Sequence, residues 1–92
     1  MVQAATAAST LRAALAELGL ARTYQSDGEG MSMVSVWANL TVWCAGEVFF
    51  WRTGHDMRDF THHPIRDPAG AAVKIRTRYE ELRNRPDLFQ PR

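Results

Sequence analysis

The sequence has one cysteine, Cys44, and one lysine, Lys74, among its 92 residues. A single cysteine excludes an intrachain disulfide framework and is typical of a reducing compartment. The sequence also lacks a run of about 18 apolar residues that would span a membrane, and its N-terminus lacks the charged and apolar segments of a secretory signal. We therefore expect a cytoplasmic protein that makes no membrane contact.

Motifs that would name a reaction are also missing. The sequence contains no Gly-x-Ser-x-Gly, no His-Glu-x-x-His and no glycine-rich phosphate loop. Its net charge of +1 gives no global attraction to nucleic acid or to an anionic membrane. We expect a protein that is not an enzyme and that needs no cofactor.

The length and composition predict one globular domain. The chain is 46% hydrophobic and 23% charged, which argues against intrinsic disorder. No linker divides it, so we expect a single domain over residues 1–92, with a frayed start at 1–8 and a tail at 86–92. A domain of this size buries only about 60–65% of the surface that its unfolded chain exposes. A partner that covers apolar area would therefore add stability.

A first amphipathic helix is indicated by leucines that recur at i, i+4 and i+7: Leu11, Leu15 and Leu18. Ser9 and Thr10 are candidate N-caps, although the preceding alanines also allow a start near Ala4. Gly19 is typical of the left-handed residue that ends a helix, with Leu20 folding back onto the last turn.

A second helix is indicated by an apolar stripe with helical spacing: Ala72, Ile75, Tyr79 and Leu82. Asp67 followed by Pro68 is a strong start signal, because proline is favoured at the first helical position. The helix should stop by Asn84, since Arg85 precedes Pro86 and the residue before a proline disfavours helical geometry.

Between these helices, segments rich in valine, threonine and aromatic residues predict three main strands, at residues 31–37, 40–44 and 47–52. Two-residue connections, Ala38-Asn39 and Ala45-Gly46, predict tight hairpins. Residues 21–25 are a candidate short edge strand, and the polar segment 53–66 is expected to be irregular. The fold class is thus α+β, a two-layer α-β-β-β-α arrangement with an antiparallel meander and both helices packed on one face.

The two-residue loops predict a register in which Trp37 lies opposite Leu40, and residues directly opposite share a face. One face then presents Met31, Met33, Trp37, Leu40, Val42, Cys44, Phe49 and Trp51. The other presents Val34, Val36, Thr41, Trp43, Val48, Phe50 and Arg52. Both faces are apolar, whereas a sheet with one wet face alternates apolar and polar residues.

If both helices cover one face, the other exposes an apolar patch that indicates a contact surface. We expect Trp43 and Phe50 to anchor an interface with a second copy of the chain or with another protein. The remaining interface residues are three valines in the core of the patch and two residues at its rim: Val34, Val36, Val48, Thr41 and Arg52. Two alternatives stay open, because the helices could take opposite faces, or residues 53–66 could fold over the sheet.

The densest polar cluster follows the strands: His55, Asp56, Asp59, His62 and His63. Histidine and aspartate bind zinc and act as general acids or bases, and Cys44 could serve as a nucleophile beside them. Their spacing matches no metal signature, however, and a solvated loop explains them equally well. We expect no metal, and a small metal-binding protein or enzyme is our third hypothesis.

Nucleic-acid binding is the second hypothesis, based on basic residues along one face of the second helix: Lys74, Arg78 and Arg85. In element order alone, the chain resembles the double-stranded RNA-binding domain, which implies a basic C-terminal helix placed on phosphates. The lysine cluster that starts that helix in the family is missing here. The same order also resembles small dimeric secretion chaperones. Glu80 lies four residues after Arg76, as in an ordinary ion-paired helix surface.

Overall fold

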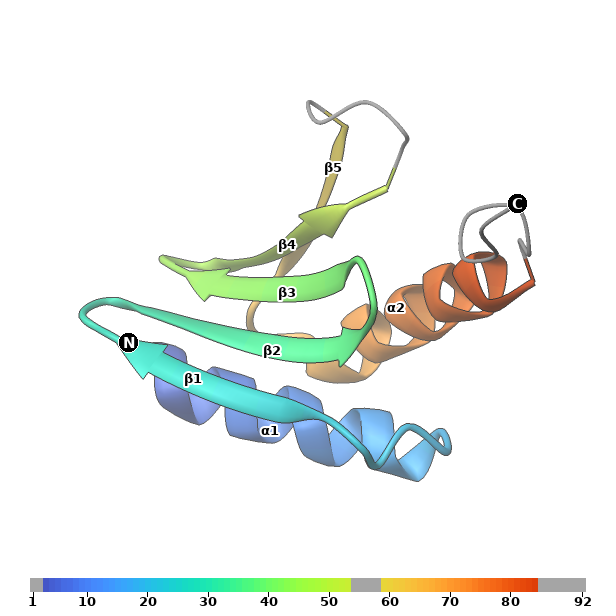
Figure 1. Ribbon diagram of the computed structural model, residues 1–92. Helices are drawn as coiled ribbons and strands as arrows, with labels where there is room; N and C mark the ends of the chain where they lie inside the picture. Colours follow the sequence, from blue (N-terminus) through green and yellow to red (C-terminus); the bar gives the residue numbers. More distant parts are fainter. Residues whose placement is uncertain (1–2, 54–58, 85–92) are drawn as a thin grey trace.

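The computed structural model describes residues 3–53 and 59–84, and shows a helix, a five-stranded antiparallel sheet and a second helix (Figure 1). The strands neighbour one another in chain order. The elements are α1 Ala4–Glu17, β1 Tyr24–Gly28, β2 Met31–Trp37, β3 Leu40–Ala45, β4 Val48–Arg52, β5 Phe60–Pro64 and α2 Pro68–Arg83. The predicted α+β meander with a helix at each end is confirmed.

Both helices lie on the same side of the sheet, as predicted (Figure 1). They contact each other and bury small residues as well as large ones, which allows them to pack side by side over the strands. The core combines this helix layer with one face of the sheet: Ala7, Ala8, Leu11, Leu15, Val34, Val36, Leu40, Val42, Cys44, Phe49, Trp51, Ile65, Ala71, Ala72, Ile75 and Leu82. Among the described residues, neither helix combines the length and the hydrophobicity that a membrane span requires.

The ends of α1 follow the sequence signals only in part. The helix begins at Ala4, so the alanines extend it back beyond both candidate caps. At its other end Gly19 has a φ of 92°, which glycine adopts at little cost. Leu20 N–H donates to Leu15 O at 2.9 Å and Gly19 N–H donates to Ala16 O at 3.0 Å. This pair of bonds is the expected helix-ending motif.

α2 begins and ends where the sequence predicts. Asp67 caps it by accepting a hydrogen bond from Gly70 N–H at 3.1 Å, and Asn84 follows its last residue. Tyr79, on the apolar stripe of α2, packs edge-on against Trp37 with ring centroids 5.3 Å apart. This contact fixes the C-terminal half of α2 against the end of β2.

A β-bulge between Ser35 and Trp37 changes which side chains of β2 face the helices. A bulge adds one residue to a strand, and because side chains alternate, one extra residue moves the rest of the strand to the opposite face. Val34 therefore lies opposite Val42 and is 0% exposed. Val36 is 8% exposed and also belongs to the core.

The prediction that Val34 and Val36 form part of an exposed interface is therefore wrong. Their places on the face away from the helices are taken by Met31 and Met33, which are 40% and 37% exposed. The two methionines were expected on the helix-covered face, and the same one-residue shift explains both errors.

The turn between β3 and β4 lies one residue later than predicted. Ala45 pairs with Val48, so Gly46 and Glu47 form the two-residue loop, with Gly46 at a φ of 60°. This changes the register by two residues, which preserves the face of every side chain. Phe50 therefore still lies on the face away from the helices.

The polar segment 53–66 contains a strand instead of an irregular loop. β5 pairs with β4, and the pairing continues beyond the strand, since Ile65 N–H donates to Glu47 O at 2.9 Å. The described residues of segment 53–66 therefore extend the sheet beside β4. They do not cover the face of the sheet, which was the alternative left open by the sequence. Side chains alternate along β5, so Phe60 and His62 share one face and His63 lies on the other.

Candidate interaction surface

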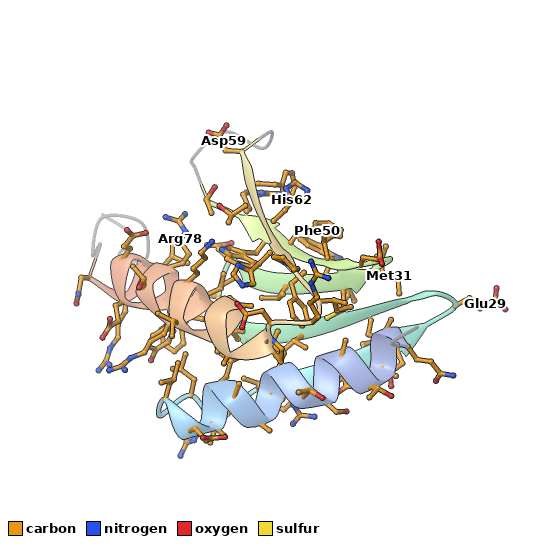
Figure 2. The ribbon with its side chains drawn as sticks, turned by 180° about the vertical axis from the view of Figure 1, so that it is seen from behind. Glu29, Met31, Phe50, Asp59, His62 and Arg78 are labelled. Atoms are coloured by element: carbon orange, nitrogen blue, oxygen red, sulfur yellow. The ribbon has the colours of Figure 1, made fainter. Side chains whose placement is uncertain are left out.

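The face of the sheet opposite the helices, called the open face below, carries most of the large side chains outside the core. Figure 2 shows Met31, Phe50 and His62 on the side away from the helices. No helix among residues 3–53 and 59–84 covers this side. Its main residues, taken from the strand register, are Met31, Met33, Thr41, Trp43, Val48, Phe50, Arg52, Phe60 and His62.

Four rings on the open face form a contiguous aromatic cluster: Trp43, Phe50, Phe60 and His62. Trp43 and Phe50 are stacked with centroids 5.7 Å apart and planes 17° apart. Phe60 approaches both edge-on, at 6.4 Å and 6.2 Å, and His62 stacks on Phe50 at 5.8 Å. These offset and edge-on geometries are the favoured arrangements of aromatic pairs. The cluster therefore presents a surface whose rings already hold one another in place.

Trp43 and Phe50 are half-buried, and their cover comes from neighbours on the same face. Phe60 reaches Trp43 from two strands away, because β5 rises out of the sheet on the side away from the helices (Figure 1). Phe60, Met31 and Met33 themselves remain more than one-third exposed. Water therefore reaches one continuous apolar surface that runs from β2 to β5.

Arg52 is the only arginine or lysine on the open face among the described strands. Its guanidinium carbon lies 6.0 Å from the centre of the Phe60 ring. Its Nε is buried and has no hydrogen-bond partner within residues 3–53 and 59–84. A buried guanidinium nitrogen without a partner is costly.

The interface residues predicted on β3 and β4 all lie on the open face: Thr41, Trp43, Val48, Phe50 and Arg52. Sequence reasoning missed Met31 and Met33 because of the bulge. It missed Phe60 and His62 because the polar composition of residues 53–66 predicted an irregular loop in place of β5. The alternation of Phe60 and His62 about a threonine is a strand pattern, but it spans too few residues to stand out.

The His/Asp cluster does not converge in the described residues. His62 and His63 are adjacent on β5, so their rings lie on opposite faces of the sheet. Asp59 is exposed at the start of β5, and His55 and Asp56 lie outside the described residues. Within residues 3–53 and 59–84, no three His, Cys, Asp or Glu side chains are grouped closely enough to hold a metal ion.

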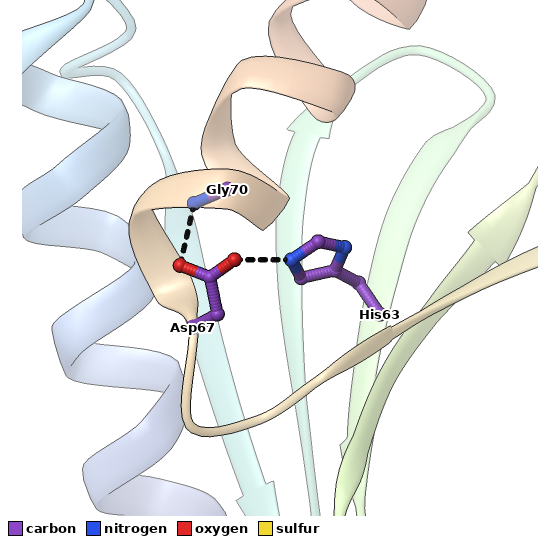
Figure 3. A network of polar contacts seen from close by, with 3 residues as sticks. All are labelled: His63, Asp67 and Gly70. Carbon is purple, nitrogen blue, oxygen red and sulfur yellow. Dashed lines mark hydrogen bonds and ion pairs between the residues drawn. The ribbon is translucent and has the colours of Figure 1, made fainter.

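His63 instead supports the start of α2 (Figure 3). Its Nε2 donates to Asp67 Oδ2 at 2.8 Å, while Asp67 Oδ1 accepts from Gly70 N–H at 3.1 Å. The bond from His63, followed by that from Gly70, lowers the pKa of Asp67 below 3.8. A carboxyl whose pKa is lowered by folding stabilises the fold above its unfolded pKa. This stabilisation is lost as the pH falls below 3.8 and through the pKa of the folded state.

Gly70→Ala tests this network. In an open helix this change stabilises by about 0.5–1 kcal/mol, but here the added Cβ would lie 2.8 Å from His63 Nε2 and collide with the Asp67 carboxylate. We expect no gain from Gly70→Ala in the wild-type background. In an Asp67→Ala background the closest clash is gone and the His63 ring, no longer bonded to Asp67, can turn aside, so the same change should recover a gain of about 0.5–1 kcal/mol.

Urea denaturation of the four proteins at about pH 7 measures this cycle, and repeating it at about pH 3 should shrink the difference between wild type and Asp67→Ala. An equal gain from Gly70→Ala in both backgrounds would show that Asp67 and His63 leave room for the methyl group.

Cys44 is buried on the helix-covered face of β3. Burial, and secondarily the negative charge of Asp27, raises the pKa of its thiol to about 11. The thiolate is the nucleophilic form of cysteine. Cys44 is therefore protonated at neutral pH and acts as a small apolar residue of the core.

The basic face of α2 is partly occupied by ion pairs. Arg78 is only 11% exposed at its side chain and lies 3.3 Å from Glu81. Lys74 is exposed one turn earlier, and Arg85 lies outside the described residues. Of the three residues of the nucleic-acid hypothesis, Lys74 is thus the one that the structure shows open to a phosphate.

None of these sites is explained by similarity to another protein. Comparison with known proteins found no matching family model, no matching curated protein and no matching solved structure.

Proposed function

We propose that this protein is a small interaction module that forms a homodimer through its open face, with Trp43 and Phe50 at the centre of the contact. The observation that carries the proposal is the aromatic cluster, which lies on a sheet face that no described helix covers. Contiguous exposed apolar surface of this kind marks interaction sites. Aromatic residues near the centre of an interface usually dominate its energy.

The size of the face sets the expected strength of the contact. Five strands spaced about 4.8 Å apart are roughly 24 Å wide, and strands of this length extend about 17–24 Å. The flat area of the face is on the order of 400 Å² per copy, without the additional surface of protruding side chains. A standard interface buries about 800 Å² per partner. We therefore expect a dimer with a dissociation constant in the micromolar range.

Trp43→Asp tests the proposal. A carboxylate in the middle of the contact would be desolvated without a partner, so the variant should be monomeric in light scattering at concentrations where the wild type is a dimer. Because Trp43 lies on the open face, the variant should keep its far-ultraviolet circular dichroism. A matched control is Val73→Asp, since Val73 is an exposed apolar residue of α2, and this variant should remain dimeric.

A wild type that stays monomeric at the highest attainable concentration would contradict the homodimer. Co-purification of one defined protein, lost in Trp43→Asp, would then favour an adaptor that uses the same face. Duplex RNA binding that weakens steeply with salt and persists in Trp43→Asp would instead favour a nucleic-acid-binding regulator using Lys74. We assign the module to the cytoplasm, because its only cysteine is a free, buried thiol.

A further inference from the structure

The two ends of the β4–β5 pair carry opposite charges in a pattern that matches a second copy of the same chain. Glu47 precedes β4 and Arg52 ends it, while Asp59 precedes β5 and Arg66 follows it. β4 and β5 are antiparallel, so one end of the pair carries Arg52 and Asp59 and the other carries Glu47 and Arg66. None of these four residues forms an ion pair within the described part of the chain.

The end with Glu47 and Arg66 is hollowed. An open cavity of about 750 Å³ lies there, between the β3–β4 turn and the end of β5. Val48 and Pro64 give it an apolar wall that continues the open face beside His62, and Glu47 and Arg66 line the cavity with opposite charges.

The end with Arg52 and Asp59 projects. Figure 2 shows Asp59 at the far end of β5, away from the helices. Next to it Phe60 is exposed, and the Arg52 guanidinium lies over the Phe60 ring. One molecule therefore offers a projecting end with an aromatic ring, a cation and an anion. The same molecule offers a hollow with an apolar wall, an anion and a cation.

We propose that the occupant of the open face is a second copy placed by a two-fold axis that runs across the strands near Phe50, so that the Arg52 and Phe60 side chains of each copy face the cavity of the other. This inference rests on the proposed homodimer and specifies its orientation. Residues 47 and 52 are about 17 Å apart along β4, and Phe50 lies close to their midpoint. A rotation about an axis at that point brings Arg52 of one copy over Glu47 of the other.

The orientation follows from the charges. A two-fold axis across the strands reverses the strand direction but places each strand over the same strand of the other molecule. This agrees with the usual aligned packing of two sheets. Arg52 then meets the partner's Glu47, and Asp59 meets the partner's Arg66. An axis along the strands through β3 would instead place β4 and β5 over β2 and β1 of the other copy and leave all four charges without these partners. An axis along the strands between β4 and β5 would pair Arg52 with the partner's Asp59 and Glu47 with the partner's Arg66, but it would leave Trp43 and the methionines of β2 uncovered.

Charge reversal gives a direct test. Arg52→Glu places two carboxylates together at both symmetric contacts, and Glu47→Arg places two cations together. Like charges in contact disfavour association, so each variant alone should raise the dimer dissociation constant at least about tenfold. In a mixture of the two variants, the carboxylate introduced at position 52 of one chain meets the guanidinium introduced at position 47 of the other, while the native pair remains at the second contact. The mixture should therefore associate within about threefold of the wild type.

Glu29→Arg is the matched control, because Glu29 lies in the β1–β2 turn at the same end of the sheet as Glu47 but away from β4 and β5. It should leave the dissociation constant unchanged. Should Arg52→Glu fail to fold by circular dichroism, Asp59→Arg and Arg66→Asp provide the same test with two exposed residues. Sedimentation velocity measures every combination.

The outcomes separate this inference from the homodimer itself. A wild-type dimer whose single variants associate normally, or whose mixture is no tighter than the variants alone, would overturn the orientation and leave the homodimer standing. A monomeric wild type would overturn both.

Discussion

Trp51→Ala is expected to lower the free energy of unfolding by about 3–5 kcal/mol, the usual cost of deleting a buried tryptophan side chain. Trp51 is 1% exposed and lies in the core between the sheet and the helices. Trp43 is on the opposite face, half-buried and stacked on Phe50, so Trp43→Ala should cost only about 1–2 kcal/mol in the monomer. The two tryptophans are of equal size, and the contrast therefore reports the face on which each lies.

The measurement is urea denaturation followed by circular dichroism at protein concentrations low enough to keep the chain monomeric. Association would otherwise stabilise the folded state by mass action and obscure the comparison. Equal losses for the two variants would show that Trp43 is buried as deeply as Trp51, and the open face would no longer be open.

Val34→Asp has the second large expected effect. Val34 is fully buried beneath the helices, and an unpaired carboxylate there should cost at least about 3–5 kcal/mol, enough to unfold much of the population of a small domain. Met33→Asp, one residue earlier and on the open face, should cost only about 1–2 kcal/mol. Nuclear magnetic resonance spectra of the two variants should show a dispersed fold for Met33→Asp only.

This pair tests the β-bulge directly. A regular hairpin from Trp37 and Leu40 would place Val34 on the open face and Met33 under the helices, and the two results would be exchanged. A folded Val34→Asp together with an unfolded Met33→Asp would therefore restore the regular register and remove the bulge.

Local signals in the sequence were sufficient to define the helices. Asp67 and Pro68 mark the start of α2, and Gly19 with Leu20 marks the end of α1, because each of these signals acts within one helical turn. The start of α1 was less well defined. Alanine favours the helix strongly, so the helix continues back through the alanines to Ala4 and does not begin at the candidate caps Ser9 and Thr10.

The residues at the centre of the open face were assigned to the correct face, while part of its margin was not. The shift of the β3–β4 turn moved the register by two residues, so Trp43 and Phe50 remained on one face. The bulge in β2 moved Val34 and Val36 by one residue, which reversed their face. A bulge depends on how a strand meets its neighbours, and no residue of β2 indicates it in the sequence.

β5 was missed for a different reason. Its residues are polar or aromatic and end in a proline, a composition more typical of a loop. Pairing with β4 supplies the backbone hydrogen bonds that make it a strand. Phe60 and His62 became part of the open face through this long-range pairing, which sequence periodicity alone does not reveal.

The buried thiol of Cys44 has a practical consequence for chemical labelling. A maleimide reacts with accessible thiolates, and a thiol that is fully buried with a pKa of about 11 supplies almost none at neutral pH. A cysteine introduced at Val73, an exposed residue of α2 away from the open face, could therefore carry a fluorophore or a spin label without prior removal of the native residue. Distances between two labelled copies could then be measured in a chain that otherwise keeps its natural sequence.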